Sequence, residues 1–337
     1  MPRVIFLYRK TNVFYSIENV FRLVASGIGK STGWSTTDVV LPRGGFSFAV
    51  LRDNLRFVRR LRADVFHVTG DAHYVTLGLP ADRTVLTIHD CVFMYQTRGV
   101  KRWILQQLLL KWPLRHVRLV TTVSEQTRKD ILRFGGCSPD KVVVIPNPVT
   151  GKITYSKKPF PPEKPVILFI GTTPNKNLDR VIEALRGVSC RLSIIGKLPD
   201  GVAERITVAG IEWTNAFGLT DQEMDGQYAA ADLLLFPSTF EGFGLPIIEA
   251  QTAGRPVITS DLSPMKEVAG DGACLVDPYD PDSIRAAVCK VAGDAGYRET
   301  LVEKGLINSK RYGAGIIASR YAEVYEQIIN ANNPCAE

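Results

Sequence analysis

The chain has 337 residues, 45% of them hydrophobic, a length that exceeds what one hydrophobic core usually supports and favours two domains. Its 6 cysteines are scattered and form no CxxC pair, which excludes a zinc site or disulfide framework of that spacing and favours a reducing cytoplasm. The net charge of +7 favours anionic partners such as phosphates or an acidic membrane face, and no stretch of about 18 apolar residues would span a bilayer.

The first half alternates short β-rich runs with longer amphipathic segments, which predicts a parallel sheet with helical crossovers. We expect strands near 3–8, 38–42, 64–68, 84–89, 118–123 and 142–146. The first strand region, RVIFLYRKTNVF, is not followed by G-x-G-x-x-G, so the usual fingerprint of a dinucleotide-dependent oxidoreductase is missing from its place.

Residues 98–118 combine basic side chains with Trp103, Leu105, Leu109 and Trp112. One interpretation is a helix that covers the sheet and has a solvated basic edge, which is the commoner origin of such a pattern. The other is an amphipathic helix that contacts an anionic membrane surface.

The segment PNPVTGKITYSKKPFPPEKP, rich in Pro, Lys and Gly, is typical of a linker and separates the two halves. In the second half we expect strands at 166–171, 191–196, 205–210, 232–236, 256–260 and 273–276. The tail GIIASRYAEVYEQIIN has apolar residues at helical spacing and predicts a terminal helix.

Two strand ends of the second half carry the candidate site, because ligands of open α/β sheets bind beyond the carboxyl ends of strands. In GTTPNKN, Gly171 permits a close turn, Asn177 can cap the next helix, and Lys176 places a cation near the positive end of that helix. A cation there makes better sense if an anion lies between them, although an ordinary solvated lysine explains the loop taken alone.

In FPSTFEGFGLPIIEA (236–250), Pro246 suits a first helical turn, which places the amides of Gly244 and Leu245 where a diphosphate can bind. Glu249 then lies about one turn into the helix and Glu241 lies at its rim. Carboxylates beside a diphosphate would be repulsive unless they face hydroxyl groups, so we expect one to bind a ribose and the other a hexose.

The stretch EGFGLPIIEA resembles the E-x7-E motif of retaining glycosyltransferases of the GT-B architecture, family 4, also called group 1. IGTTPNKN is similar to the phosphate loop of that family and VVVIPNPV to its interdomain hinge strand, while TIHDCVF and TTVSEQTRKDI resemble landmarks of its N-terminal domain. The resemblance covers essentially the whole chain. It implies an α/β fold with two Rossmann-like domains that face each other across a cleft.

The domain boundaries implied by the resemblance are an acceptor-binding domain at 1–148, a linker at 149–164 and a nucleotide-sugar-binding domain at 165–315. A C-terminal helix at 316–334 is expected to pack back toward the first domain.

The resemblance also implies roles for the residues of the motif. Glu249 is expected to hold the ribose hydroxyls, Glu241 the hydroxyls of the donor sugar, and Lys176 the diphosphate. Donor-binding positions further include Gly171, Thr172, Phe243, Gly244 and Leu245. The family usually has an Arg where Thr172 stands, so another cation, with Lys197 as the candidate, is expected to assist Lys176.

His89 ends an apolar strand of the first half and is expected, with Glu241 and Lys176, to take part in catalysis, a structural role being the alternative. Asp90 is expected to orient the loop. Lys10, Asn12 and Tyr15, in the loop after the first strand, are candidates for acceptor binding, and an ordinary polar loop is an equal alternative.

The resemblance implies transfer of a hexose from GDP-mannose or a UDP-sugar to an acceptor hydroxyl, with retention, in cell-envelope polysaccharide or glycolipid assembly. No cofactor and no metal are expected, because fixed cations and helix dipoles can balance the diphosphate. The expected partners are the nucleotide sugar, a glycan or lipid-linked acceptor and an anionic membrane surface, but no nucleic acid, and the expected location is the cytoplasm or the inner face of the cell membrane.

Other activities on the same fold stay open as alternatives. They are a nucleotide-sugar epimerase and a non-catalytic protein that binds sugar nucleotides. A phosphorylase would need a pyridoxal phosphate lysine site and a much longer chain.

Overall fold

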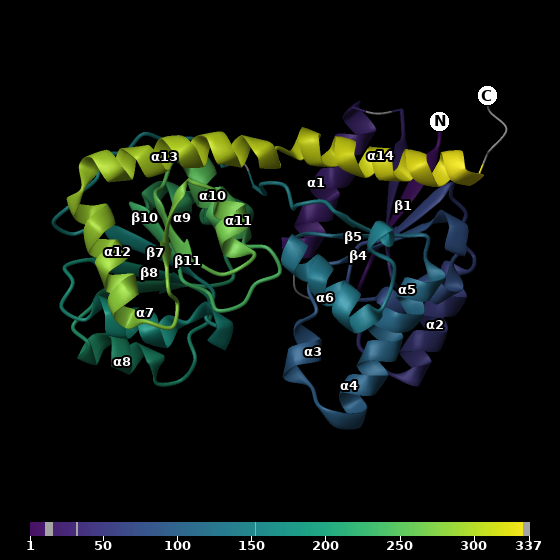
Figure 1. Ribbon diagram of the computed structural model, residues 1–337, viewed down its shortest axis with the longest axis horizontal. Helices are drawn as coiled ribbons and strands as arrows, with labels where there is room; N and C mark the ends of the chain where they lie inside the picture. Colours follow the sequence, from purple (N-terminus) through teal and green to yellow (C-terminus); the bar gives the residue numbers. More distant parts are fainter. Residues whose placement is uncertain (11–15, 32, 152, 333–337) are drawn as a thin grey trace. The chain divides into compact units, whose positions relative to one another are not determined.

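The computed structural model describes residues 1–10, 16–31, 33–151 and 153–332, which divide into two compact units (Figure 1). Unit 1 comprises Met1–Pro148 and the C-terminal segment from Gly313, and unit 2 comprises Val149–Tyr312. Within the described ranges, each unit contains one six-stranded sheet whose neighbouring strands are all parallel. The predicted α/β class is confirmed.

The sheet of unit 1 has the order β2-β1-β3-β4-β5-β6. Its strands are β1 Arg3–Tyr8, β2 Ser35–Val40, β3 Val65–Val68, β4 Thr84–Ile88, β5 Leu119–Thr122 and β6 Val142–Val144. The helices of this unit are α1 Ser16–Ser31, α2 Phe48–Val58, α3 Val92–Gln96, α4 Gly99–Gln106, α5 Trp112–His116, α6 Glu125–Gly135 and α14 Ala314–Asn332. Strands β3 and β4 are buried along their whole length, as expected for central parallel strands that are covered on both faces.

The predicted terminal helix is α14, and it belongs to unit 1, where it packs on α1 (Figure 1). Its predicted apolar stripe is buried: Ile317, Tyr321, Val324, Tyr325 and Ile328. The hydroxyl of Tyr325 also lies 2.6 Å from Nδ1 of the buried His67 on β3. This contact ties the end of the chain to the centre of the sheet of unit 1.

The sheet of unit 2 has the order β12-β11-β10-β7-β8-β9. Its strands are β7 Val166–Ile170, β8 Arg191–Ile195, β9 Glu212–Ala216, β10 Leu233–Phe236, β11 Val257–Ser260 and β12 Ala273–Val276. The helices of this unit are α7 Leu178–Leu185, α8 Val202–Val208, α9 Asp221–Ala230, α10 Leu245–Ala253, α11 Met265–Ala269, α12 Pro281–Gly293 and α13 Ala295–Ser309.

One strand prediction is wrong. The run at 205–210 lies in α8 and the turn that follows it, and the strand is β9, which begins at Glu212. Val202 and Ile206, four residues apart, are buried on one face of the helix, whereas Val208 is 77% exposed. Strand β9 is at the edge of the sheet and largely exposed, so its sequence EWTNA lacks the apolar run that identifies a central strand.

Residues 153–164 have no helix or strand, but hydrogen bonds and an ion pair hold them against the rest of unit 2. The buried guanidinium of Arg255 donates through Nη2 to the main-chain oxygen of Ser156, 3.0 Å away, and through Nε to that of Tyr228, also 3.0 Å away. The ammonium of Lys158 lies 2.7 Å from the buried carboxylate of Asp232. The segment predicted as a linker therefore has specific contacts with the unit to which it belongs.

The basic segment 98–118 is mostly helical and divides into two parts. Leu110, Pro113 and Leu114 are buried and cover the core of unit 1, which fits the first interpretation. Helix α4, by contrast, has no buried residue. None of the helices in the described ranges is long and apolar enough to cross a membrane.

Candidate active site

The order of strands along the sheet of unit 2 reverses between β7 and β10, which are neighbours. The chain runs from β7 outward to β9 on one side, and then from β10 outward to β12 on the other. In open α/β sheets, ligands bind in the crevice at such a reversal, beyond the carboxyl ends of the strands. The loops that follow β7 and β10 contain GTTPNK and STFEGFG, the stretches in which the sequence predicts the candidate site.

These loops are joined to each other by hydrogen bonds. The amide of Thr239 donates to the main-chain oxygen of Asn175 over 2.8 Å, and Nδ2 of Asn175 donates to the main-chain oxygen of Phe240 over 2.9 Å. These hydrogen bonds hold together residues that are more than 60 positions apart in the chain.

Lys176 follows Asn175 in the first of these two loops. Its Nζ is 2.6 Å from Oε1 of Glu241, and the two side chains are only 18% and 14% exposed. The ring centroid of Phe236 is 4.6 Å from the same ammonium. A Cβ on Gly171, where φ is +90°, would approach Cε of Lys176 to 2.8 Å. The ammonium is therefore held by a carboxylate and an aromatic face, and Gly171 leaves room for its stem.

The predicted capping role of Asn177 is wrong. Asn177 occupies the N-cap position of α7, but its backbone is left-handed, with φ at 71°, and its side chain makes no capping hydrogen bond. Instead Nδ2 donates to the main-chain oxygens of Pro237, 3.1 Å away, and Pro278, 2.6 Å away. The side chain thus binds the loops after β10 and β12, and its Oδ1 accepts a hydrogen bond from Nη1 of Arg180, on α7, over 2.9 Å.

Thr172 occupies the position at which the family resemblance leads us to expect an arginine. Its Oγ1 donates to the main-chain oxygen of Lys197 over 2.6 Å, which joins the loop after β7 to the loop after β8. Lys197 is exposed, and its ammonium forms no ion pair with any residue that the structure describes.

Helix α10 begins immediately after the second loop. Gly244 is its N-cap residue, with φ at +113°, and Leu245 and Pro246 are its first two residues. The first amides of a helix lack acceptors within the helix and lie at its positive end, so this terminus suits an anion. Phe243 is buried, and its ring packs edge-on against that of Tyr312 at 5.8 Å between centroids, so its side chain serves packing.

Glu249 lies one turn into α10 and is already hydrogen-bonded. Thr150 donates to Oε1, and the hydroxyl of Tyr228, on α9, donates to Oε2 over 2.6 Å. Burial raises the pKa of this carboxyl group, while the two hydrogen bonds oppose the shift. Burial, together with the neighbouring carboxylate, raises the pKa of Tyr228, so that Tyr228 stays a donor. Because a carboxylate has about four lone-pair directions, Glu249 can accept further hydroxyl groups.

Sequence reasoning missed Thr150, Asn175 and Tyr228. The best signal is that of Tyr228, a large aromatic residue within the otherwise small and polar helix DQEMDGQYAA, where it is the buried member. The contacts of Thr150 and Asn175 depend on chain segments that meet only in the folded unit.

In unit 1, His89 follows β4 and is 9% exposed. Its Nε2 lies 2.8 Å from the main-chain oxygen of Thr69, and since that oxygen can only accept, Nε2 carries the proton. Burial lowers the pKa of His89 to about 4. The imidazole is therefore neutral near pH 7, and Nδ1 has a lone pair. The neighbouring Asp90 accepts a hydrogen bond from the amide of Val92 over 2.9 Å, so it orders the loop.

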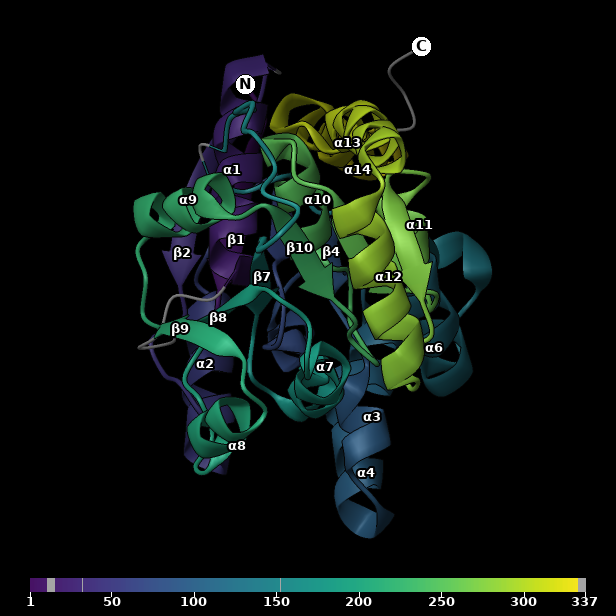
Figure 2. The ribbon, with the colours of Figure 1, turned by 90° about the vertical axis from the view of Figure 1, so that its left-hand side faces the viewer.

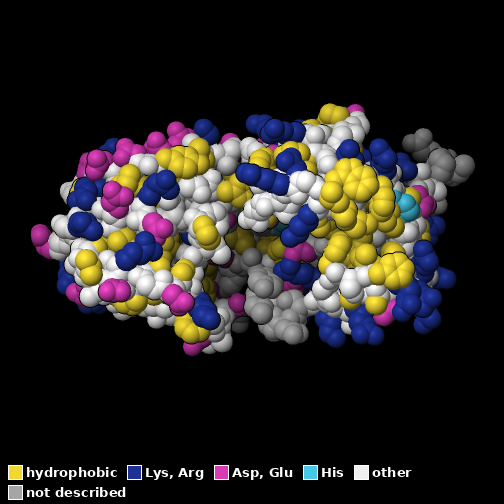
Figure 3. All heavy atoms as spheres, turned by 90° about the horizontal axis from the view of Figure 1, so that it is seen from below, with side chains coloured by type: hydrophobic (Ala, Val, Ile, Leu, Met, Phe, Trp, Pro, Cys, Tyr) yellow, Lys and Arg dark blue, Asp and Glu magenta, His cyan; other side chains and the backbone are white. Residues whose placement is uncertain are grey.

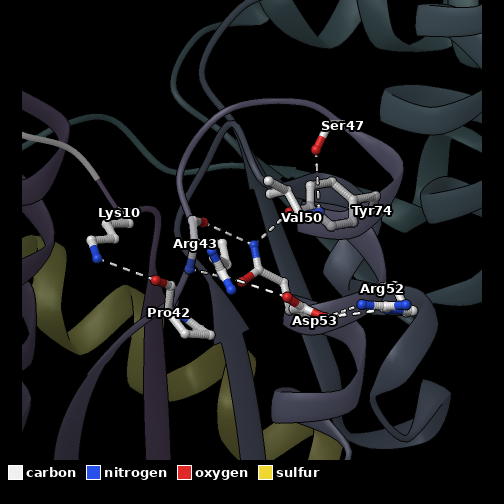
Figure 4. A network of polar contacts seen from close by, with 9 residues as sticks. Lys10, Pro42, Arg43, Ser47, Val50, Arg52, Asp53 and Tyr74 are labelled. Atoms are coloured by element: carbon white, nitrogen blue, oxygen red, sulfur yellow. Dashed lines mark hydrogen bonds and ion pairs between the residues drawn. The ribbon is translucent and has the colours of Figure 1, made fainter.

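Of the predicted acceptor residues, Asn12 and Tyr15 lie outside the described residues. Lys10 donates to the main-chain oxygen of Pro42 over 3.3 Å (Figure 4). Lys10 and the loop Pro42–Gly45 line a cavity of about 370 Å³. The buried side chain of Asn54 holds this loop, since Nδ2 donates to the main-chain oxygen of Arg43 over 3.0 Å and Oδ1 accepts from its amide over 3.1 Å.

Sequence reasoning also missed Arg9, which lies beside β1 at the strand-order reversal of unit 1. Its Nε is 2.9 Å from Oε1 of Glu18, and its Nη1 contacts the carboxylate of Asp71 in the loop after β3. A single arginine after a strand has no distinctive signal in the sequence.

A larger cavity of about 820 Å³ lies at the opposite edge of unit 2, beside Asp232 and Pro256, which precede β10 and β11. It contains none of the predicted site residues. Among the residues that the structure describes, no group of three or more His, Cys, Asp and Glu side chains is placed to hold a metal ion.

Comparison with known proteins identifies the family. Residues 164–294 match the family model Glycosyl transferases group 1, and residues 32–150 match Glycosyltransferase Family 4. Together the two matches show that the chain belongs to the glycosyltransferases of group 1, also called family 4.

Two relatives from the curated proteins are mannosyltransferases. The O-antigen chain mannosyltransferase B of Escherichia coli is 29% identical over 262 residues, which are 68% of this chain and 67% of the relative. The MMP alpha-(1->4)-mannosyltransferase of Mycolicibacterium hassiacum is 27% identical over 285 residues, which are 77% of this chain and 68% of the relative.

Solved structures show the same fold. Sucrose-phosphate synthase from Thermosynechococcus elongatus has a TM-score of 0.80 at 17% identity, covering 98% of this chain and 100% of that one. Anabaena HepE, in complex with UDP and glucose, has a TM-score of 0.79 at 16% identity, covering 97% and 100%. The two six-stranded sheets with their helices form the GT-B fold that the sequence predicts.

Proposed function

We propose that this glycosyltransferase moves a hexose from a nucleoside diphosphate sugar to a hydroxyl group of a glycan or lipid-linked acceptor, with retention of the anomeric configuration. The observation that carries the proposal is the ammonium of Lys176, held 2.6 Å from Glu241 at the strand-order reversal of unit 2. Glu241 lies in the loop that leads into the N-terminus of α10, so the loop also supplies a helix end suited to a diphosphate.

The names of the relatives support mannose as the sugar and polysaccharide assembly as the process. The UDP and glucose bound to HepE support a nucleotide sugar as the donor class. We therefore propose GDP-mannose first and a UDP-sugar second.

In the proposed reaction, the bond between the anomeric carbon and the diphosphate oxygen breaks, and the electron pair leaves with the diphosphate. The acceptor oxygen bonds to the anomeric carbon on the same face, and its proton passes to the departing phosphate oxygen. Because negative charge grows on the diphosphate, Lys176 and the first amides of α10 interact more strongly in the transition state than in the ground state. We assign no nucleophilic role to either glutamate.

The remaining residues act on hydroxyl groups. Glu249 accepts hydrogen bonds from the ribose, and Glu241, which shares Lys176 with the diphosphate, accepts from the sugar. The lone pair on Nδ1 of the neutral His89 accepts from a substrate hydroxyl group. Lys10 and the cavity beside it contact the acceptor.

We also propose that the reaction needs no metal ion, since Lys176 and the dipole of α10 supply positive charge to the leaving group. Lys197 is the candidate for a second cation, because its main chain is fixed by Thr172 beside the loop of Lys176.

The test is incubation with GDP-mannose, UDP-glucose and ADP-glucose, with and without a mannose-containing acceptor. We expect acceptor-dependent release of the nucleotide, an α-linked product by NMR from an α-linked donor, and unchanged turnover in EDTA. An epimerised sugar nucleotide formed without acceptor would indicate the epimerase, and nucleotide binding without turnover on any acceptor would indicate a non-catalytic binding protein. Loss of turnover in EDTA that Mg²⁺ restores would contradict metal independence.

A further inference from the structure

Helix α4 carries apolar side chains that nothing in unit 1 covers. Figure 2 shows α3 and α4 extending from unit 1 beyond its sheet. Val100 is 73%, Trp103 60% and Ile104 40% exposed, and their spacing places them on one face of the helix. A surface helix normally turns such a face toward the core. We call this region the α4 surface, formed by Val100, Trp103, Ile104 and the 45% exposed Trp112, with Arg98, Lys101 and Arg115.

The exposed face does not result from loose attachment, because other side chains of α4 hold it in place. Nε2 of Gln106 donates to the main-chain oxygen of Phe134 over 2.7 Å, and the guanidinium of Arg102 lies 5.6 Å from the centroid of the Phe134 ring. The helix then continues through a π-helical segment, Gln107–Lys111, into α5, where Leu114 is buried. Short π-helical segments of this kind are frequent at functional sites.

The charge of the segment has one sign. Between Asp90 and Glu125 the sequence contains no Asp or Glu, whereas it contains six basic side chains: Arg98, Lys101, Arg102, Lys111, Arg115 and Arg118. Figure 3 shows hydrophobic side chains gathered on the right-hand half of the view, over unit 1, with Lys and Arg side chains around them. The α4 surface is thus apolar with a basic margin.

We propose that the α4 surface binds an anionic lipid bilayer. Tryptophan favours the interface between lipid and water, where its ring is in the apolar region and its N–H can find an acceptor. The basic side chains around it would meet the lipid phosphates. With eight residues, α4 is far shorter than the roughly 20 that a bilayer crossing needs, so it would lie in the plane of the interface.

A second copy of the chain is a poorer occupant of this surface. In a twofold symmetric dimer the same surface lies on both partners, so two basic margins would face each other. An anionic bilayer instead neutralises them, and this complementarity decides between the two occupants.

The experiment is flotation of the full chain with vesicles, with no turnover involved, so that its failure leaves the proposed transferase reaction standing. We expect binding to phosphatidylcholine vesicles that contain about one quarter phosphatidylglycerol, release at high salt, and no binding to pure phosphatidylcholine. Equal binding to both vesicles, or binding to neither, would overturn the proposal.

Substitutions test whether the α4 surface is the part of the chain that binds the vesicles. We expect Trp103→Glu and Lys101→Glu each to weaken vesicle binding by about tenfold or more. The matched controls on α13 of unit 2, Ile307→Glu and Lys304→Glu, replace exposed side chains of the same kinds and are expected to bind like the wild type. Thermal unfolding and nucleotide binding report whether each variant is folded.

Two outcomes of the variant series would overturn the proposal. One is equal loss of vesicle binding in the α4 and α13 variants, which would indicate a general effect of charge. The other is a concentration-dependent dimer, seen by light scattering, that Trp103→Glu dissociates, because this would assign the surface to a second copy.

Discussion

Gly171 permits both a left-handed backbone and the passage of the Lys176 stem, and a test can separate the two effects. Its φ is +90°, and an added Cβ would lie 2.8 Å from Cε of Lys176. Gly187 is a matched control in the same unit, because its φ is +76° and an added Cβ would meet nothing within 4 Å.

We expect Gly171→Ala and Gly187→Ala to lower the free energy of unfolding alike, by about 1 kcal/mol, since both force a side chain into a left-handed conformation. Only Gly171→Ala should also weaken nucleotide binding, by at least about tenfold, because it displaces the ammonium that makes a charge-assisted hydrogen bond. Calorimetric titration and thermal unfolding measure the two effects. Equal affinities in the two variants would contradict the role of Gly171 in positioning Lys176.

The partly buried carboxyl group of Glu249 is expected to make donor binding sensitive to acid. Burial raises its pKa, so it gains a proton at a higher pH than an exposed glutamate and then loses an acceptor for the ribose hydroxyls. We expect the dissociation constant of the nucleotide to rise as the pH falls through this raised pKa. In Glu249→Gln the affinity should be lower and should lack this pH dependence. A wild-type affinity for the nucleotide that stays constant as the pH falls to the pKa of an ordinary glutamate would contradict this role of Glu249.

The raised pKa of Glu249 also affects the stability of the fold. Ionisation of Glu249 favours nucleotide binding but is unfavourable for folding. A raised pKa means that the folded state binds the proton more tightly than the unfolded state, so this contribution to stability is lost as the pH rises through the folded pKa. Above this raised pKa the ionised Glu249 therefore costs stability, and there Glu249→Gln should unfold at a higher temperature than the wild type while it binds the nucleotide less well.

At the scale of elements, the packing of α14 on α1 depends on a small residue. An added Cβ on Gly27 would lie 2.7 Å from Cβ of Ala318, whereas on Gly29, in the same helix, it would find Thr36 at an ordinary 3.7 Å. Neither glycine has a positive φ.

We expect Gly29→Ala to stabilise unit 1 by up to about 1 kcal/mol, because alanine favours the helix. Gly27→Ala should lower the stability instead, because the two helices must separate. Denaturant unfolding of both variants measures the difference. If both substitutions stabilise the protein, the close packing of α14 on α1 is contradicted.

Periodicity predicted most elements because the central strands are apolar on both faces and α14 has a clear buried stripe. It failed at 205–210, where the apolar residues of α8 imitate a strand while the true edge strand β9 is half polar. Lys176, Glu241 and Glu249 could be selected from the sequence because two strand ends and a helix start surround them. The Lys176–Glu241 contact and the donors to Glu249 could not, since they depend on which strands are neighbours and on hydrogen bonds between distant loops.

At the scale of the whole molecule, the two units should respond differently to acid. All 4 histidines of the sequence precede residue 149, and burial lowers the pKa of His67 to about 3, of His89 to about 4, and that of His73 as well. Protonation therefore favours the unfolded state of unit 1. This stability is complete above the ordinary histidine pKa near 6.5 and is lost as the pH falls toward the folded values.

We expect hydrogen exchange at pH 5, corrected for the intrinsic rate, to show a larger loss of protection in unit 1 than in unit 2 relative to pH 7.5. Replacement of the buried His67 by Gln should reduce that difference. An equal loss of protection in both units, or a larger loss in unit 2, would contradict the prediction that the buried histidines make unit 1 the more acid-sensitive unit.

The most direct test of the donor site is calorimetric titration of the wild type and Lys176→Met with the nucleoside diphosphate of the donor and with its nucleoside. If Lys176 binds the diphosphate, the variant loses about tenfold to a hundredfold in affinity for the diphosphate, as expected for one charge-assisted hydrogen bond, and binds the nucleoside like the wild type. Unchanged diphosphate affinity in a variant that unfolds like the wild type, or an equal loss for both ligands, would contradict the proposed role of Lys176.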